Sequence, residues 1–377
     1  MTAKPQKILA VYGTRPEAIK MAPVIAALLR RPEKLSVTVC TTGQHREMLD
    51  QVQDLLGLRP DLDLRLMQHN QTLNGLAAGA LAAMDEVLVA QAPDWLLVQG
   101  DTTTAMTAAV AAFHRGVRVG HVEAGLRTGD LQQPFPEEAN RRVIDLLSAA
   151  LFAPTERSRQ ALLAEGTDPE RIHVVGNTVI DALQSIAAGL STDREDEKPE
   201  RPEVLVTVHR RESFGAPVRE IFTALRELAE RFPGVVWIYP VHRNPNVRGP
   251  AAEILGGLPN LELHDPFDYQ ELVRRLLRCR FVLTDSGGIQ EEAPTFGKPV
   301  LVLRETTERP EGVDAGVAKL VGASRETIVN KASRLLTSDE AFQAMARAVN
   351  PYGDGHASER IAAILAGEPW TPFEPGT

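Results

Sequence analysis

Cysteine and long apolar runs are both scarce in this chain. Its 377 residues include only two cysteines, Cys40 and Cys279, far apart and each in an apolar, strand-like stretch. This excludes a disulfide scaffold and indicates a reducing compartment. We find no run of about 18 apolar residues, so we expect no segment that spans a bilayer. The apolar stretch at 7–13 is too short for a signal peptide and predicts a strand. We therefore expect a soluble cytoplasmic protein.

An excess of basic residues is missing too, as are the common cofactor motifs. The net charge is −9, from 41 basic and 50 acidic residues. Nonspecific binding to nucleic acid or to an anionic membrane needs a basic face, so neither partner is expected. The sequence has no H-E-x-x-H, no paired cysteines, no P-loop and no G-x-G-x-x-G. It also has no G-x-S-x-G turn of the hydrolases. We therefore predict no metal and no resident cofactor.

Short β-branched runs alternate with helical patterns along the whole chain. The runs show no polar alternation, which predicts parallel strands buried on both faces. At one domain per roughly 150 residues, the length favours two domains. The polar, Pro-containing stretch 189–202 is the best candidate for a linker. We therefore expect an α/β fold with two doubly wound, Rossmann-like domains, 1–188 and 203–377, and a ligand cleft between them.

Residues that follow predicted strands are the candidates for chemistry in the first domain, because ligands bind beyond the carboxyl ends of such strands. Arg15 and Lys20 follow the first strand, at a strand-to-helix turn that favours an anion. A single surface cation would be the simpler interpretation of either residue. Asp101 follows the strand that begins at Trp95, and from spacing alone a helix N-cap is its likelier role. Glu123 follows the next strand.

An acidic helix start completes this set. Glu137 and Glu138 open the segment PEEANRR, and Arg141 and Arg142 follow four residues later. As structure, this is a dipole-compatible helix start with i,i+4 ion pairs. As chemistry, Glu137 could join Asp101 and Glu123 in one cleft. Crowded carboxylates raise each other's pKa, which suits proton abstraction from carbon near neutral pH.

The second predicted domain contains the sharpest local signal, the segment TDSGGIQEE. Ser286 and two glycines, Gly287 and Gly288, would expose several N–H donors at a helix start, as a diphosphate requires. A tight structural turn is the alternative. Glu292, one turn later, could accept hydrogen bonds from ribose hydroxyls, and His209 ends another strand beside two arginines. These patterns predict a nucleotide-diphosphate enzyme and leave sugar transfer, epimerisation and hydrolysis open.

Ten motifs resemble one family, in the same order and over about 7–365. They are GTRPEAIKMAP, TGQHREMLDQV, GDTTTA, HVEAGLRTGD, PEEANRR, VGNTVIDAL, HRRESFG, TDSGGIQEEAP, GKPVLVLRETTERPEG and NPYGDGHASERI. The sequence is similar to the non-hydrolysing UDP-N-acetylglucosamine 2-epimerases. The resemblance implies the GT-B arrangement of two Rossmann-like domains, with the final helix packed back on the first, and a homodimer. It also implies reversible conversion to UDP-N-acetylmannosamine by elimination and re-addition of UDP, in cell-surface polysaccharide synthesis.

The resemblance also assigns roles to individual residues. It implies that the catalytic groups are Asp101, Glu123, Glu137 and His209. It implies that the substrate is bound by Arg15, Lys20, Arg141, Phe267, Leu272, Ser286, Gly287, Gly288, Glu292 and Arg309.

Three positions depart from the family pattern. Leu272 stands where the family has an aromatic residue near the uracil. Gln44 and His45 match an allosteric substrate site of bacterial relatives, but Glu47 and Asn70 replace a glutamine and an arginine of that site. The alternatives are a 2-epimerase of a UDP-diacetamido-uronic acid, a GT-B glycosyltransferase, a noncatalytic nucleotide-sugar sensor and a hydrolysing relative.

Overall fold

The computed structural model of the chain describes residues 4–43, 46–67, 71–190, 199–210 and 213–376. The chain forms two compact units. Unit 1 comprises Met1–Ala182 and Tyr352–Glu374, and unit 2 comprises Leu183–Pro351 and Pro375–Thr377. The helix α7 (Thr178–Leu190) begins in unit 1 and ends in unit 2. The predicted linker, 189–202, thus begins a few residues after the point where the chain first passes from one unit to the other.

Unit 1 is built on a seven-stranded sheet in the order β3-β2-β1-β4-β5-β6-β7. The strands are β1 (Gln6–Tyr12), β2 (Leu35–Thr41), β3 (Leu62–Asp63), β4 (Trp95–Gln99), β5 (Arg118–Val122), β6 (Ala150–Ala153) and β7 (Ile172–Val174). The helices are α1 (Arg15–Leu29), α2 (Arg46–Leu55), α3 (Leu73–Gln91), α4 (Thr103–His114), α5 (Glu137–Leu147), α6 (Glu156–Ala164) and α15 (Ala357–Leu365), with a 3-10 turn at Pro169–Arg171.

Unit 2 repeats this plan on a six-stranded sheet in the order β10-β9-β8-β11-β12-β13. Its strands are β8 (Glu203–Thr207), β9 (Val236–Pro240), β10 (Leu261–His264), β11 (Phe281–Thr284), β12 (Val300–Val302) and β13 (Ala318–Leu320). Its helices are α8 (Ala216–Arg231), α9 (Pro245–Leu255), α10 (Tyr269–Arg278), α11 (Gly287–Glu292), α12 (Pro310–Asp314), α13 (Arg325–Thr337) and α14 (Asp339–Ala346), with a 3-10 turn at Ala293–Phe296.

Parallel pairing throughout confirms the predicted α/β fold with two Rossmann-like sheets. In unit 1 the strand order reverses between β1 and β4, and in unit 2 it reverses between β8 and β11. Loops diverge at such a switch point and leave a crevice beyond the strand ends. The topology therefore selects four loops as candidate ligand-binding segments: those that follow β1, β4, β8 and β11.

Continuous apolar runs form the core of each unit. In unit 1, Leu9, Val98 and Val119 of the sheet pack with Ala108 of α4 and Met84 of α3. In unit 2, a larger cluster packs helices α8, α9 and α13 on the sheet around the fully buried rings of Phe222, Trp237 and Tyr239. The central strands are buried on both faces, so polar groups that could meet a ligand lie mainly at the strand ends and in the loops that follow them.

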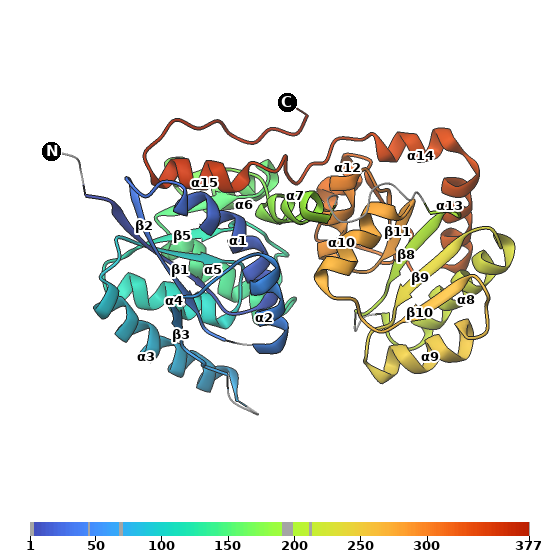
Figure 1. The fold of residues 1–377 in the computed structure, drawn as a ribbon, viewed down its shortest axis with the longest axis horizontal. Helices are drawn as coiled ribbons and strands as arrows, with labels where there is room; N and C mark the ends of the chain where they lie inside the picture. Colours follow the sequence, from blue (N-terminus) through green and yellow to red (C-terminus); the bar gives the residue numbers. More distant parts are fainter. Residues whose placement is uncertain (1–3, 44–45, 68–70, 191–198, 211–212, 377) are drawn as a thin grey trace. The chain divides into compact units, whose positions relative to one another are not determined.

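The last helix, α15, belongs to unit 1 and packs on α1 (Figure 1). Arg31 at the end of α1 binds both Glu359 of α15 and Glu368, each with an N–O distance of 2.9 Å. Lys34 also reaches Glu368, at 2.8 Å. These ion pairs hold the C-terminal segment against the first helix of the chain.

One helix departs from the expectation that no apolar segment reaches membrane-spanning length. By length and composition, α3 is the only helix among the described residues that could cross a bilayer, and 28% of its most apolar window is buried. This finding is weak evidence for a membrane-spanning segment, because helices of soluble proteins pass the same test of length and composition. Leu76, Met84 and Leu88 of α3 are buried, whereas Leu73 and Val89 are exposed.

Candidate functional site

The β1–α1 turn begins the candidate site of unit 1. Thr14 caps α1, and its hydroxyl accepts from the amide of Glu17, while Glu17 accepts from the amides of Gly13 and Thr14, both at 2.7 Å. This is a capping box, which fixes the angle at which the helix begins. Arg15 is the first residue of α1 and is half-buried. Among the described residues it has no ion-pair partner, so its charge is available to an anion.

Glu17 is a site residue that sequence reasoning missed. Its side chain is buried, and its second oxygen accepts a hydrogen bond of 2.6 Å from the hydroxyl of Thr102, after β4. Burial raises the pKa of Glu17, although its hydrogen bonds act in the opposite direction. Glu17 thereby joins the loops that follow β1 and β4, which are neighbours in the sheet. The T-x-x-E spacing of Thr14 and Glu17 is the sequence signal that could have identified it.

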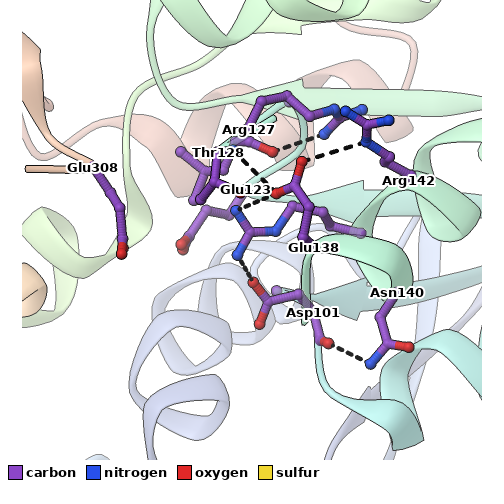
Figure 2. Close-up of polar contacts among 12 residues, drawn as sticks. Asp101, Glu123, Arg127, Thr128, Glu138, Asn140, Arg142 and Glu308 are labelled. Carbon is purple, nitrogen blue, oxygen red and sulfur yellow. Dashed lines mark hydrogen bonds and ion pairs between the residues drawn. The ribbon is translucent and has the colours of Figure 1, made fainter. Parts of the chain in front are cut away.

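The predicted N-cap role of Asp101 is wrong. Thr102, one residue later, is the N-cap of α4, and its hydroxyl accepts from the amide of Ala105 at 3.1 Å. The Asp101 carboxylate instead lies 2.5 Å from Arg141 of α5, and its backbone carbonyl accepts from Asn140 at 2.9 Å (Figure 2). Thr102, which has an extended backbone conformation, caps α4 with its hydroxyl. The Asp101 carboxylate is therefore available for a role other than capping.

Substitutions at this turn should separate capping from chemistry. We expect Thr102→Ala to lower the free energy of unfolding by about 1 kcal/mol, the usual cost of a lost N-cap. Thr102→Ser should restore most of it, because a serine hydroxyl can both cap α4 and donate to Glu17. Asp101→Asn should cost less than Thr102→Ala. Urea denaturation of the three variants measures these differences, and a larger loss at Asp101 than at Thr102 would contradict the assignment.

Glu123 follows β5 in a backbone conformation that non-glycine residues rarely adopt, with φ +70°. Such strain persists only where the surroundings hold it, and it is frequent at functional sites. Here the Glu123 carboxylate forms an ion pair with Lys20 of α1 and accepts a hydrogen bond of 2.8 Å from Gln99 at the end of β4. The predicted substrate cation Lys20 is thus bound to a predicted catalytic acid.

The two acids at the start of α5 have different surroundings. Glu138 is fully buried and supplies the predicted structural pairs, with Arg142 at 3.3 Å and Arg141 at 3.4 Å. It also accepts from the amide of Thr128 at 3.1 Å (Figure 2). Glu137 is half-buried at the first position of α5 and, among the described residues, has no hydrogen-bond or ion-pair partner. Glu138 therefore supports the fold, and Glu137 is available for chemistry.

In unit 2, a buried carboxylate organises the loops that follow β8 and β11. Asp285 accepts from the amides of His209 and Arg210 at 2.9 Å, and its other oxygen lies 3.1 Å from Nδ1 of His209. Burial acts to raise the pKa of Asp285, but the His209 contacts and these amides outweigh it, so the pKa is lowered. The His209 ring stacks on that of His242. With Nδ1 directed at Asp285, Nε2 of His209 is the nitrogen left for a ligand.

Ser286 is the N-cap of α11, and its hydroxyl accepts from the amide of Ile289. The glycines that follow are not required by the fold. A Cβ at Gly287 would meet only the end of the Arg210 side chain, at 3.4 Å, and one at Gly288 would meet nothing closer than 3.9 Å. Neither glycine has a positive φ. The structure therefore leaves room at both positions, as a ligand that approaches the backbone would need.

The remaining predicted nucleotide-site residues surround α11. Glu292 at its end is buried and accepts from the hydroxyl of Tyr269 at 3.3 Å. Phe267 and Leu272 are partly buried and pack against the cluster that includes Ile289. Arg309 forms an ion pair with Glu291, which places it beside the same helix. The allosteric candidates Gln44 and His45 lie outside the described residues.

Comparison with known proteins decides the family. The family model for UDP-N-acetylglucosamine 2-epimerase matches residues 27–366. The chain belongs to the UDP-N-acetylglucosamine 2-epimerase family. The Escherichia coli UDP-N-acetylglucosamine 2-epimerase is 49% identical over 369 residues, which is 95% of this chain and 98% of that protein. The Yersinia pestis protein of the same name is 50% identical over 369 residues, with the same coverage.

Solved structures of this family share the fold. The crystal structure of the UDP-GlcNAc 2-epimerase from Neisseria meningitidis bound to UDP-GlcNAc has a TM-score of 0.87 and 44% identity, over 96% of this chain and all of that one. The resemblance drawn from the ten motifs is thereby confirmed, as is the GT-B-like pair of Rossmann-like units. The roles of individual residues stay predictions. Among the described residues, no group of three His, Cys, Asp or Glu side chains could hold a metal ion.

Proposed function

We propose that this protein is an isomerase that interconverts UDP-N-acetylglucosamine and UDP-N-acetylmannosamine. The observation that carries the proposal is the match to the 2-epimerase family over nearly the whole chain. The geometry supports it: Asp101 follows β4, one of the two strands at the switch point of unit 1, Glu123 follows the neighbouring strand β5, and Glu137 begins the helix that binds Asp101. Transfer to an acceptor would not by itself require three carboxylates around the sugar.

The reaction must move a proton that is not acidic. No carbonyl adjoins C2 of the sugar, so simple abstraction would leave an unstabilised carbanion. In the proposed first step, a carboxylate takes the C2 proton while the bond from C1 to the UDP oxygen breaks. The C–H electrons form the C1–C2 double bond of 2-acetamidoglucal, and UDP leaves with the C–O electrons. In the second step, a proton adds to the opposite face of C2 and UDP adds back to C1.

Each half of this scheme needs groups that the structure provides. Asp101, Glu123 and Glu137 are the proposed acid and base groups. The Lys20 ammonium and the Gln99 amide hold the Glu123 carboxylate in place. The Arg15 guanidinium and the Arg141 guanidinium would stabilise the charge that develops as UDP departs.

Unit 2 is proposed to bind UDP. The absence of close neighbours around an added Cβ at Gly287 and Gly288 supports diphosphate binding, and Arg309 beside α11 adds a cation. Glu292 would accept from the ribose hydroxyls, and Phe267 and Leu272 would contact the uracil. His209, held by Asp285, would place its Nε2 toward the substrate.

Turnover in heavy water tests the proposal. The protein is incubated with UDP-N-acetylglucosamine and no acceptor, and the products are observed by NMR. We expect the manno isomer of the UDP-sugar with deuterium at C2, because the proton that returns comes from solvent-exchanged groups. Free N-acetylmannosamine plus UDP would instead identify a hydrolysing enzyme. A product that retains its original C2 proton would exclude the elimination scheme, and no turnover at all would favour a sensor or a transferase.

We also propose that the protein is a cytoplasmic homodimer. The apolar helix α3 leaves Val89 exposed by 61%, and Phe113 of the neighbouring helix α4 is exposed by 57%. A second copy of the chain would bury such side chains.

The proposed cytoplasmic location is supported by the cysteines. Both are free and buried, which suits a reducing compartment, and burial raises the pKa of each thiol to about 12.

A further inference from the structure

A buried histidine in β5 links the predicted catalytic loops of unit 1. The side chain of His121 is fully buried, and both ring nitrogens contact oxygen atoms. Nδ1 lies 2.6 Å from the Asp145 carboxylate of α5, and Nε2 lies 2.7 Å from the backbone carbonyl of Gly100. A carbonyl oxygen can only accept, so Nε2 must carry a proton. With Nε2 on the Gly100 carbonyl, Nδ1 is the nitrogen through which Asp145 fixes the ring.

Asp145 is held as a carboxylate by several donors. The Arg127 guanidinium lies 2.7 Å from its second oxygen, which also accepts from the amide of Gly125 at 3.3 Å. Burial acts to raise the pKa of Asp145, but the charges and hydrogen bonds of His121 and Arg127 outweigh it, so the pKa is lowered. A carboxylate held by these donors keeps its charge, and it fixes the His121 ring through Nδ1.

The backbone that the His121 ring holds leads directly to two proposed catalytic acids. Gly100, whose carbonyl binds the ring, precedes Asp101 and has φ +71°. The Gly100 amide donates to the carbonyl of Val122 at 3.1 Å, and Val122 precedes the strained Glu123. Displacement of the Gly100 peptide would therefore move both carboxylates. Misplacement by about 1 Å can cost roughly 10²-fold in rate.

We propose that His121 and Asp145 are positioning residues for the epimerisation: the His121 ring, fixed by Asp145, holds the Gly100 carbonyl and thereby orients Asp101 and Glu123. This inference rests on the proposed function, because it gives those two acids a chemical role. Neither His121 nor Asp145 exchanges a proton with the substrate in this scheme.

The hydrogen bond from His121 to Gly100 can be observed without any substrate. Long-range ¹H–¹⁵N spectra of the protein with ¹⁵N-labelled histidine show which ring nitrogens carry a proton, and a His121→Gln variant identifies the signal that belongs to this residue. We expect a proton on Nε2 of His121, because the Gly100 carbonyl can only accept. A His121 ring without a proton on Nε2 in the unmodified protein overturns the proposal.

Kinetics of Asp145→Leu test the positioning role. Leucine has a similar shape but no oxygen to contact Nδ1, so the His121 ring is no longer fixed against the Gly100 carbonyl. We expect kcat to fall roughly 10–100-fold with KM within a few-fold, the pattern of a lost transition-state arrangement. The matched control is Glu165→Gln, which removes the other carboxylate bound to Arg127, at 2.7 Å, and leaves His121 untouched. Its kcat should stay within a few-fold of the parent.

The outcomes separate this inference from the proposed function. An unmodified protein that does not epimerise UDP-N-acetylglucosamine contradicts the function, whereas the ring spectra still decide the state of His121. Full kcat in Asp145→Leu, or an equal loss in Glu165→Gln, overturns the positioning role. If Asp145→Leu does not fold, Asp145→Glu is measured instead, since it keeps the charge at a shifted position and should again lower kcat and leave KM little changed.

Discussion

Asp101→Asn, Glu123→Gln and Glu137→Gln are each expected to lower kcat roughly 10²–10⁴-fold, the usual contribution of a positioned general acid or base. Each amide keeps the shape of the acid and removes its capacity to take a proton. UDP affinity should change little, because the proposed UDP site lies on unit 2. Initial rates of formation of the manno isomer, followed by NMR or chromatography, give kcat. Calorimetric titration with UDP gives the UDP affinity.

Two neighbouring acids serve as controls. Asp130 is exposed in the loop between Glu123 and α5, and its carboxylate accepts only from the amide of Gln132 among the described residues. Asp130→Asn removes a charge from the same loop and should leave kcat within a few-fold. Glu138→Gln removes a buried acid next to Glu137 and should lower the melting temperature more than Glu137→Gln does. If all three test amides turn over within a few-fold of the parent, the three-carboxylate scheme is wrong, and His209 becomes the leading candidate.

The same variants can show at which step each acid acts. A variant blocked in the second half-reaction should release 2-acetamidoglucal and UDP, because elimination still occurs. A variant blocked in the first half-reaction cannot release either. Mass spectrometry of the reaction mixture distinguishes the two.

The sequence was sufficient for the alternation of strands and helices because the buried strands are apolar on both faces. It did not show two of the four edge strands, β3 and β13, which are two and three residues long. Such short segments have no detectable periodicity, and only pairing with a neighbour makes them strands. Strand order was also absent from the local pattern, because it depends on which crossovers pack. That order is what brings the loops after β1 and β4, and after β8 and β11, together.

The sequence also did not show which of two neighbouring polar residues takes which structural role. Spacing could not tell whether Asp101 or Thr102 caps α4, since either side chain can accept from the helix amides. It could not tell whether Glu137 or Glu138 pairs with the arginines, since both lie within three or four residues of one. The three-dimensional contacts decide both cases: Thr102 caps, and Glu138 pairs.

Contacts between residues far apart in sequence had no local signal at all. Lys20 and Glu123 are separated by 103 positions, and His209 and Asp285 by 76. From the sequence alone, Lys20 and His209 could each be interpreted only as a surface cation or as a ligand contact. Their partners become visible only once the sheets place the loops side by side.

Gly287→Val is expected to weaken UDP binding roughly 10²-fold or more with little change in thermal stability. A β-branched side chain would occupy the space through which a diphosphate reaches the amides at the start of α11. Loss of two hydrogen bonds to a charged group, at about 1.5–3 kcal/mol each, accounts for an effect of this size. The fold itself should tolerate the change, because the added Cβ meets only the flexible end of Arg210 at 3.4 Å. Valine is also a better helix former than glycine.

The matched control for Gly287→Val is Gly249→Val. Gly249 is exposed within α9 of the same unit, and a Cβ there meets nothing within 4 Å. Both variants add the same side chain to a helical glycine, so a difference in UDP affinity between them, measured by calorimetric titration, reports on the α11 turn. Because Ser286 still caps α11 in the variant, lost affinity cannot be ascribed to a melted helix if the melting temperature is kept. Unchanged UDP affinity in a folded Gly287→Val protein would exclude this turn as the diphosphate site. Arg309 and Arg15 would then be the remaining candidates for diphosphate binding.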